Sequence, residues 1–195
     1  VTRVLGIVDG TTNYIRDEMA SKGLDFDTVL ATAQDLGYAE ADPTADVDGH
    51  DAASKAALLA QLAFHTRVSI DAVSVKGIRD VTAEAIAQAE SAGFALKLLA
   101  IAERVGTDAV TVRVAPTLVP LTHPLSSVHG AFNAVVVESE SAGRLMFYGQ
   151  GAGGAPTASA VLSDLVAAAS HKVRGGNAPR ESAYAALRVV GSEET

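Results

Sequence analysis

The sequence predicts an α+β fold in which helices cover one face of a β-sheet. Two observations carry this prediction. Helix-like patterns fill most of the chain up to residue 92, whereas four strand-like segments follow one another after Gly93. The chain has 195 residues, of which 48% are hydrophobic, and this is enough for one domain with a sizeable core.

The first part of the chain is expected to form one strand and then four helices. A run of β-branched and apolar residues over 3–8 predicts a buried strand, which the turn-forming pair Asp9-Gly10 ends. The predicted helices span residues 11–22, 25–36, 51–64 and 82–92, with Thr11 or Thr12 as the cap of the first and Asp51 at the start of the third. In the third helix, the side chains expected to face the core are Leu58, Leu59, Leu62 and Ala63. Residues 69–78 are expected to be irregular or extended.

The second part of the chain is expected to form the sheet. The predicted strands span residues 96–103, 109–115, 133–140 and 144–148. The stretch 116–130 is longer than an ordinary connection, and loops of that length are often functional. An Ala/Val/Leu-rich helix is predicted over 155–171. The polar segment after it contains two glycines, so we expect a domain at residues 1–174 and a C-terminal linker at 175–195.

Composition excludes several classes of function. The formal net charge of −8 argues against a nucleic-acid backbone as partner, because phosphate binding requires a basic face. The absence of cysteine excludes disulfides and thiolate metal sites. The sequence has neither an apolar run long enough for a membrane span nor a signal-peptide pattern, which favours a cytoplasmic protein. Because the chain begins at Val1 inside an apolar stretch, we expect it to be part of a longer protein.

An acidic segment between residues 37 and 55 is the strongest candidate for a functional site. Its charged residues are Glu40, Asp42, Asp46, Asp48, Asp51 and Lys55. Asp51 and Lys55 are four residues apart, so they would share a helix face. Such a pair is compatible with an ordinary surface ion pair and equally with a site that binds an ammonium group and moves a proton. A calcium loop is excluded, since Lys55 would occupy the position that requires a bidentate Glu.

The acidic segment is part of a longer pattern with fixed spacing, Ala33-x-x-x-Gly37-Tyr38-Ala39-x-x-Asp42-Pro43-x-x-Asp46-Val47-x-Gly49-x-Asp51-x-x-x-Lys55. This pattern resembles the signature of the homoserine dehydrogenases. Further segments resemble the family in the same order, at residues 6–15, 97–100, 116–120, 123–125, 132–135 and 147–160. One departure is Asp9, where the family more often carries Asn.

The resemblance implies a fold, an activity and a set of site residues. The fold would be α+β with a mixed, largely antiparallel sheet that pairs across a homodimer. The activity would be the NAD- or NADP-dependent interconversion of L-homoserine and aspartate semialdehyde, without a metal. By resemblance, Lys55 would donate and accept the proton, Asp51 would orient it, and Glu40 and Asp46 would bind the substrate ammonium. The remaining implied positions are Tyr38, Gly10 and Thr11 at the substrate, and Gly151 and Gly153 at the cofactor.

The glycine-rich segment 149–154 fits the dinucleotide-binding spacing G-x-G-x-x-G, and it lies between a predicted strand and a predicted helix. A dinucleotide fold also requires a second strand that ends in an acidic residue about 20 positions later, and residues 171–176 do not provide it. We therefore reject a Rossmann domain in this chain. By resemblance, the nucleotide-binding domain precedes this segment and is missing here, so most of the cofactor site is expected elsewhere.

Two alternatives to the enzyme domain remain open from the sequence. One is a non-catalytic module, derived from the enzyme, that binds an amino acid or mediates dimerisation. The other is a free-standing nucleotide binder that uses the glycine-rich segment.

Overall fold

The computed structural model describes residues 1–175 and 184–191. Within these residues, seven strands form one sheet with the order β2-β4-β3-β1-β5-β6, and β7 pairs with β4 beside that path. The strands are β1 (Arg3–Ile7), β2 (Ser74–Val75), β3 (Phe94–Val105), β4 (Ala109–Pro120), β5 (Phe132–Ser139), β6 (Gly143–Gln150) and β7 (Arg188–Val190). Only β2 and β7 run parallel to their neighbour β4. The predicted mixed, largely antiparallel sheet is thus confirmed.

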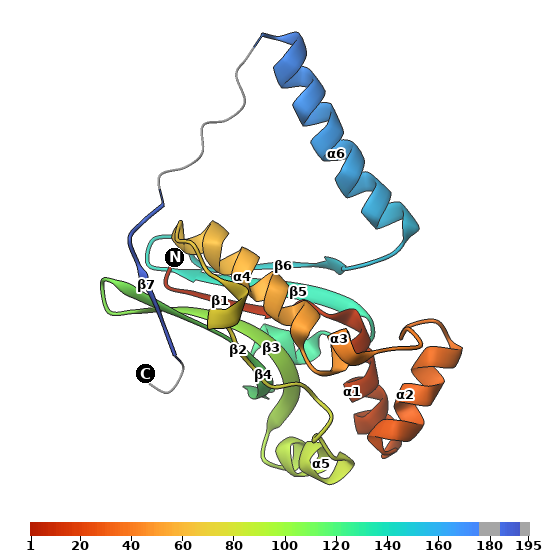
Figure 1. Ribbon diagram of the computed structural model, residues 1–195. Coiled ribbons are helices and arrows are strands. Elements are labelled where there is room, and N and C mark those ends of the chain that lie inside the picture. Colours follow the sequence, from red (N-terminus) through yellow and green to blue (C-terminus); the bar gives the residue numbers. More distant parts are fainter. Residues whose placement is uncertain (176–183, 192–195) are drawn as a thin grey trace.

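Five of the described helices lie before β3 in the chain and cover one face of the sheet (Figure 1). They are α1 (Gly10–Lys22), α2 (Phe26–Asp35), α3 (Thr44–Val47), α4 (His50–Phe64) and α5 (Ala83–Ser91). Helices α1, α4 and α5 contact β3, and α2 packs on α1. The short 3-10 helices η1 (Ile70–Ala72) and η2 (Pro124–Ser127) lie in connections, and α6 (Gly154–Val173) follows β6.

Alternation along the strands divides the sheet's apolar side chains between two clusters. Val4 and Ala100 belong to the large core beneath the helices. Their chain neighbours Leu5 and Leu99 point to the opposite face and form a smaller cluster there. Leu125 and other apolar residues of the segment 121–131 cover that smaller cluster. This segment therefore packs on the sheet and is fixed in position, although it is a connection.

Helix α4 packs on the sheet mainly through alanines. Leu58 and Leu62 are 60% and 74% exposed, so the prediction that they face the core is wrong. Leu59 and Ala63 are partly buried against the core. The buried stripe consists of Ala52, Ala53, Ala56, Ala57, Ala60 and Phe64. Small side chains on this stripe let the helix approach the strands closely, and Leu58 and Leu62 then lie on the opposite face of the same helix.

Three element boundaries differ from the predicted ones. Helix α1 is capped by Asp9 and not by a threonine, since Asp9 accepts a hydrogen bond from the backbone N–H of Thr12. Helix α4 begins after Gly49, which has a φ of 85° that favours glycine, so Asp51 lies in the first turn. Strand β4 continues to Pro120. Beyond residue 114 its outer edge has no strand partner in the described part of the chain, and a proline is tolerated on such an edge.

After β6 the chain leaves the sheet in α6 and returns to it in β7. Helix α6 buries none of its residues and projects from the body of the domain (Figure 1). Strand β7 lies inside the range 175–195 that was expected to be a linker, so that range is not a linker throughout. Residues 176–183 and 192–195 of the expected linker lie outside the described residues. None of the described helices is both long and apolar enough to cross a membrane.

Candidate active site

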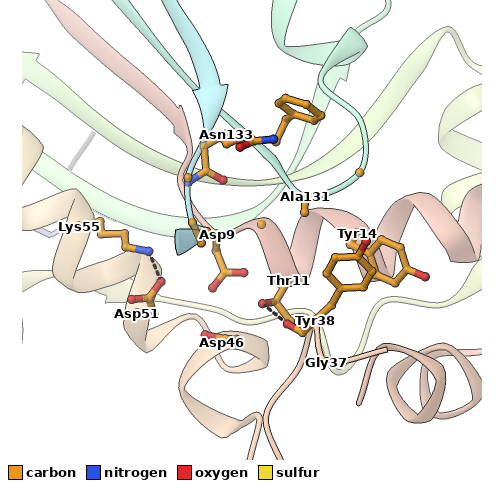
Figure 2. A pocket seen from close by; sticks show the side chains of 17 residues that line it. Asp9, Thr11, Tyr14, Gly37, Tyr38, Asp46, Asp51, Lys55, Ala131 and Asn133 are labelled. Atoms are coloured by element: carbon orange, nitrogen blue, oxygen red, sulfur yellow. Dashed lines mark hydrogen bonds and ion pairs between the residues drawn. The ribbon is translucent and has the colours of Figure 1, made fainter. Parts of the chain in front are cut away.

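A cavity of about 880 Å³ opens where the start of α1, the start of α4 and the β6–α6 loop meet (Figure 2). Five segments contribute to its lining, namely residues 9–14, 37–38, 46–55, 130–133 and 150–153. The cavity contains the residues Gly10, Thr11, Tyr38, Asp46, Asp51, Lys55, Gly151 and Gly153 that the sequence suggested as site residues. Glu40 does not line it, since its side chain is exposed on the loop after Tyr38. The structure therefore brings together all the suggested site residues except Glu40.

Lys55 projects from α4 toward the cavity and is held by two acceptors. Its Nζ donates to Asp51 Oδ2 at 2.6 Å (Figure 2). It also donates to the backbone oxygen of Val8 at 3.0 Å. An ammonium group has three donors, so one hydrogen remains for a ligand. The predicted helix-face contact between Asp51 and Lys55 is confirmed. Held in this way, Lys55 can exchange a proton with a hydroxyl group that enters the cavity.

Asp9 is a carboxylate at the base of the cavity that the sequence marked only as part of a turn. It is 6% exposed, and its Oδ1 accepts hydrogen bonds from the backbone N–H and the hydroxyl of Thr12. Burial raises the pKa of Asp9 to about 6, and the nearby carboxylates of Asp46 and Asp51 add to the rise, while the hydrogen bonds from Thr12 oppose it. The three carboxylates have oxygens that lie within 4.8 Å of one another. Such an arrangement can hold a small cation or an ammonium group.

The substitution Asp9→Asn is expected to stabilise the folded domain at neutral pH. Because the pKa of Asp9 is higher in the folded chain than its ordinary value of 3.8, its contribution to stability is fully present below about pH 4 and is lost as the pH rises through 6. Asparagine caps a helix as well as aspartate does and carries no charge. We expect a gain of about 2–3 kcal/mol at pH 8 and none at pH 3, measured by urea unfolding. An equal gain at both pH values would contradict this account.

The loop at residues 37–38 is held against α1. The hydroxyl of Thr11 donates to the backbone oxygen of Tyr38 at 2.9 Å (Figure 2). The rings of Tyr14 and Tyr38 pack with their centroids 4.6 Å apart. The N-terminal half of α1 thereby fixes the aromatic wall of the cavity.

The opposite wall, at residues 128–131, is held by a buried polar clamp that we define as Asn13, Asp17 and Lys97. Asn13 Nδ2 donates to the backbone oxygen of Gly130 at 2.7 Å, and Asp17 Oδ2 accepts from the backbone N–H of Gly130 at 2.6 Å. Lys97 Nζ donates to Asn13 Oδ1 at 3.2 Å and to the backbone oxygen of Val128, and lies 3.5 Å from Asp17 Oδ1. The side chain of Lys97 is fully buried. Burial, and then the charge of Arg16, lower the pKa of Lys97 to about 7.

The clamp was not predicted as a unit. Lys97 appeared within a predicted strand and at the start of a segment that resembles the family, without a role of its own. Its contacts with α1 and with the segment 128–131 join residues that are far apart in the sequence. A lysine in the middle of a buried strand is the one sequence signal that could have indicated it, because such a lysine requires partners.

The glycine-rich loop forms the third side of the cavity. Strand β6 pairs antiparallel with β5, so this loop is not part of a parallel β-α-β unit and the rejection of a Rossmann fold is confirmed. Gly151 packs so closely on Asn133 that a side chain there would overlap the asparagine amide. Asn133 Oδ1 is buried and has no hydrogen-bond partner among the described residues. A ligand that displaces this loop slightly could donate a hydrogen bond to that oxygen.

Comparison with known proteins agrees with this arrangement of residues. The homoserine dehydrogenase family matches residues 1–166. Homoserine dehydrogenase of Corynebacterium glutamicum is 59% identical over 199 residues, which cover 100% of this chain and 45% of that protein. The enzyme of Mycobacterium tuberculosis H37Rv is 62% identical, over 97% of this chain and 44% of its own length.

Solved structures agree as well. The crystal structure of a homoserine dehydrogenase from Thiobacillus denitrificans superimposes with a TM-score of 0.93 at 39% identity, covering 97% of this chain and 45% of that one. A hyperthermophilic archaeal homoserine dehydrogenase in complex with NADPH superimposes with a TM-score of 0.70 at 28% identity, over 85% of this chain and 46% of that one. This chain spans less than half the length of these relatives, and it belongs to the homoserine dehydrogenase family.

Proposed function

We propose that residues 1–174 form the substrate-binding, catalytic and dimerisation domain of an enzyme that interconverts L-homoserine and L-aspartate 4-semialdehyde with NAD or NADP. The observation that carries the proposal is the cavity in which Lys55 and three carboxylates face a glycine-rich loop. Family membership supports the reaction class. The chain covers only 45% of the length of the C. glutamicum relative, so the activity is proposed for the enzyme to which this domain belongs.

The site residues suggested by the sequence have proposed roles in this reaction. Lys55 takes the proton from the substrate hydroxyl during oxidation and returns it during reduction. As a neutral amine, its Nζ would donate its two hydrogens to Asp51 and to the backbone oxygen of Val8, which leaves its lone pair to accept the hydroxyl proton. Asp46 accepts a hydrogen bond from the substrate ammonium, and such charge-assisted bonds are strong. Glu40 is a second proposed acceptor, which would have to reach the cavity from the adjacent loop. Tyr38, Gly10 and Thr11 line the substrate.

The nicotinamide end of the cofactor would bind beside Gly151 and Gly153. The fit rests on the backbone of this loop, which carries no Cβ at these two positions, and on the unpartnered oxygen of Asn133. The bound cofactor would supply the hydride acceptor. We propose that the rest of the nucleotide is held by a part of the enzyme outside these 195 residues, and that the choice between NAD and NADP is made there.

A cytoplasmic homodimer completes the proposal. In the described part of the chain, β6 has a strand partner on one side only. Its apolar side chains Leu145, Met146, Phe147 and Tyr148 are 36–65% exposed. An apolar strand edge of this kind suits pairing with a second copy. Sedimentation equilibrium would test this, and a monomer at micromolar concentration would contradict it.

The proposed function is tested by turnover. We expect a full-length enzyme that contains this domain to reduce NAD or NADP when L-homoserine is added. The isolated 195-residue chain should turn over little, since holding the hydride acceptor in place can account for roughly 7–11 kcal/mol of a barrier. No turnover by the folded full-length enzyme would favour the alternative, a non-catalytic amino-acid-binding or dimerisation module. Turnover by the isolated chain would contradict the proposed division of the site.

A further inference from the structure

In the described part of the chain, only one of the two carboxylate oxygens of Asp9 accepts hydrogen bonds. Oδ1 accepts both hydrogen bonds from Thr12. Oδ2 makes no hydrogen bond within residues 1–175 and 184–191, although Asp9 is only 6% exposed. Figure 2 shows the carboxylate of Asp9 between Asp51 and Thr11, facing the side of the cavity where Asp46 lies. An oxygen without a partner, on a largely buried side chain that lines a cavity, is available to a ligand donor.

The oxygens of Asp9, Asp46 and Asp51 form a triangle whose sides are at most 4.8 Å. The centre of an equilateral triangle with that side lies about 2.8 Å from each corner, which is the N···O distance of a hydrogen bond between an ammonium and a carboxylate. An ammonium group has three hydrogens that can each point to one corner. Asp51 also accepts a hydrogen bond from Lys55. An ammonium at this centre and the proposed proton acceptor Lys55 would therefore contact the same carboxylate.

The negative charge of Asp9 is not required by the fold. Asparagine would accept the hydrogen bond from the backbone N–H of Thr12 equally well at this helix cap. Charge instead costs stability here, because the carboxylate is buried and lies beside Asp46 and Asp51. Among the residues that the structure describes, Lys55 is the only lysine or arginine that lines the cavity. A cationic ligand would offset this cost.

We infer that Asp9, together with Asp46, binds the ammonium group of the amino-acid substrate and makes the site select amino acids over hydroxy acids that lack the ammonium. The inference rests on the proposed function, because it names the group of the substrate that this part of the same cavity holds. It assigns Asp9 to substrate contact, where the resemblance placed only Asp46 and the exposed Glu40.

The test compares two inhibitors in a full-length enzyme that contains this domain. L-2-aminobutanoate has the ammonium and lacks the hydroxyl, and 4-hydroxybutanoate has the hydroxyl and lacks the ammonium. The substitution Asp9→Asn should raise the inhibition constant of L-2-aminobutanoate by about ten-fold, since a hydrogen bond to a charged group is lost. The same substitution should leave that of 4-hydroxybutanoate unchanged or lower it, because a negative charge near its carboxylate is removed.

Asp25→Asn is the matched control. Asp25 caps α2 with the same contacts, accepting hydrogen bonds from the backbone N–H and hydroxyl of Thr28, and it lies outside the cavity. It should change neither inhibition constant. An equal change for both inhibitors with Asp9→Asn would overturn the inference, as would no change for either while the wild-type enzyme turns over homoserine. An effect that disappears when sodium is replaced by a bulky organic cation would assign the triangle to a metal ion and also overturn it. Failure of the wild-type enzyme to oxidise homoserine would instead contradict the proposed function.

Discussion

Replacing Lys55 by methionine is expected to lower kcat for homoserine oxidation by about 10²–10⁴-fold in a full-length enzyme that contains this domain. Lys55 is the only lysine or arginine that lines the cavity in the described part of the chain, and its Nζ is held by Asp51 and by the backbone oxygen of Val8. Methionine keeps the length and the apolar stem but cannot accept the hydroxyl proton. Since the proton moves in the transition state, kcat should fall while KM for homoserine changes little.

Lys22→Met is the control for this experiment. Lys22 also pairs with a carboxylate four residues away on a helix, that of Glu18, but it lies on the surface of α1. Its substitution should leave kcat within about two-fold, as expected when an exposed ion pair is lost. If Lys55→Met retained kcat at the level of this control, Lys55 would not be the proton acceptor, and the non-catalytic module would be favoured.

Asp17→Asn is expected to destabilise the domain by about 3–5 kcal/mol, because it removes the only carboxylate of the polar clamp. Asp17 pairs with Arg16, lies near Lys97 and accepts from the backbone N–H of Gly130. Arg16 and Lys97 have side chains that are 6% and 0% exposed. Without Asp17 the buried Arg16 loses its paired carboxylate, and Lys97, whose pKa burial lowers to about 7, loses a carboxylate neighbour. The loss is measured as the change in free energy of unfolding in urea.

Glu18→Gln provides the comparison for Asp17. It lies next in the sequence and pairs with the exposed Lys22, so its loss should cost less than about 0.5 kcal/mol. Similar costs for the two substitutions would show that the clamp contributes no more than a surface ion pair. Because Asp17 also holds the wall at Gly130, its substitution should loosen the cavity as well as the fold.

From residue spacing alone, the sequence predicted only the part of the site that is set by local geometry, and the other site residues were suggested by the family resemblance. Asp51 and Lys55 are four residues apart on one helix, and helix periodicity alone brings their side chains together. The strand at 3–7 and the cap at Thr82 were likewise readable from short patterns. The orientation of α4 could not be predicted from the sequence. This helix is apolar on both sides, so its hydrophobic pattern does not show that the alanines face the sheet.

The parts that the sequence did not predict depend on contacts between distant segments. Asp9 read as a turn residue, and its place in the carboxylate triangle follows only when α3 and α4 fold beside it. Lys97 meets Asn13 across 84 residues of chain. Glu40 shows the converse, since it lies within the acidic segment in sequence and outside the cavity in space. The spacing of residues in the sequence determines which side chains are neighbours on one helix or strand. It does not determine how the helices and strands pack on one another.

The most direct test of the account is a calorimetric titration of L-homoserine into this chain, beside the variant Asp46→Asn. Circular dichroism should first show that both proteins are folded. The account predicts one binding site per chain and an affinity that falls about ten-fold in the variant, since Asp46 is a proposed partner of the substrate ammonium. Absence of binding to the folded chain, or equal binding to both proteins, would contradict the claim that this cavity holds the substrate.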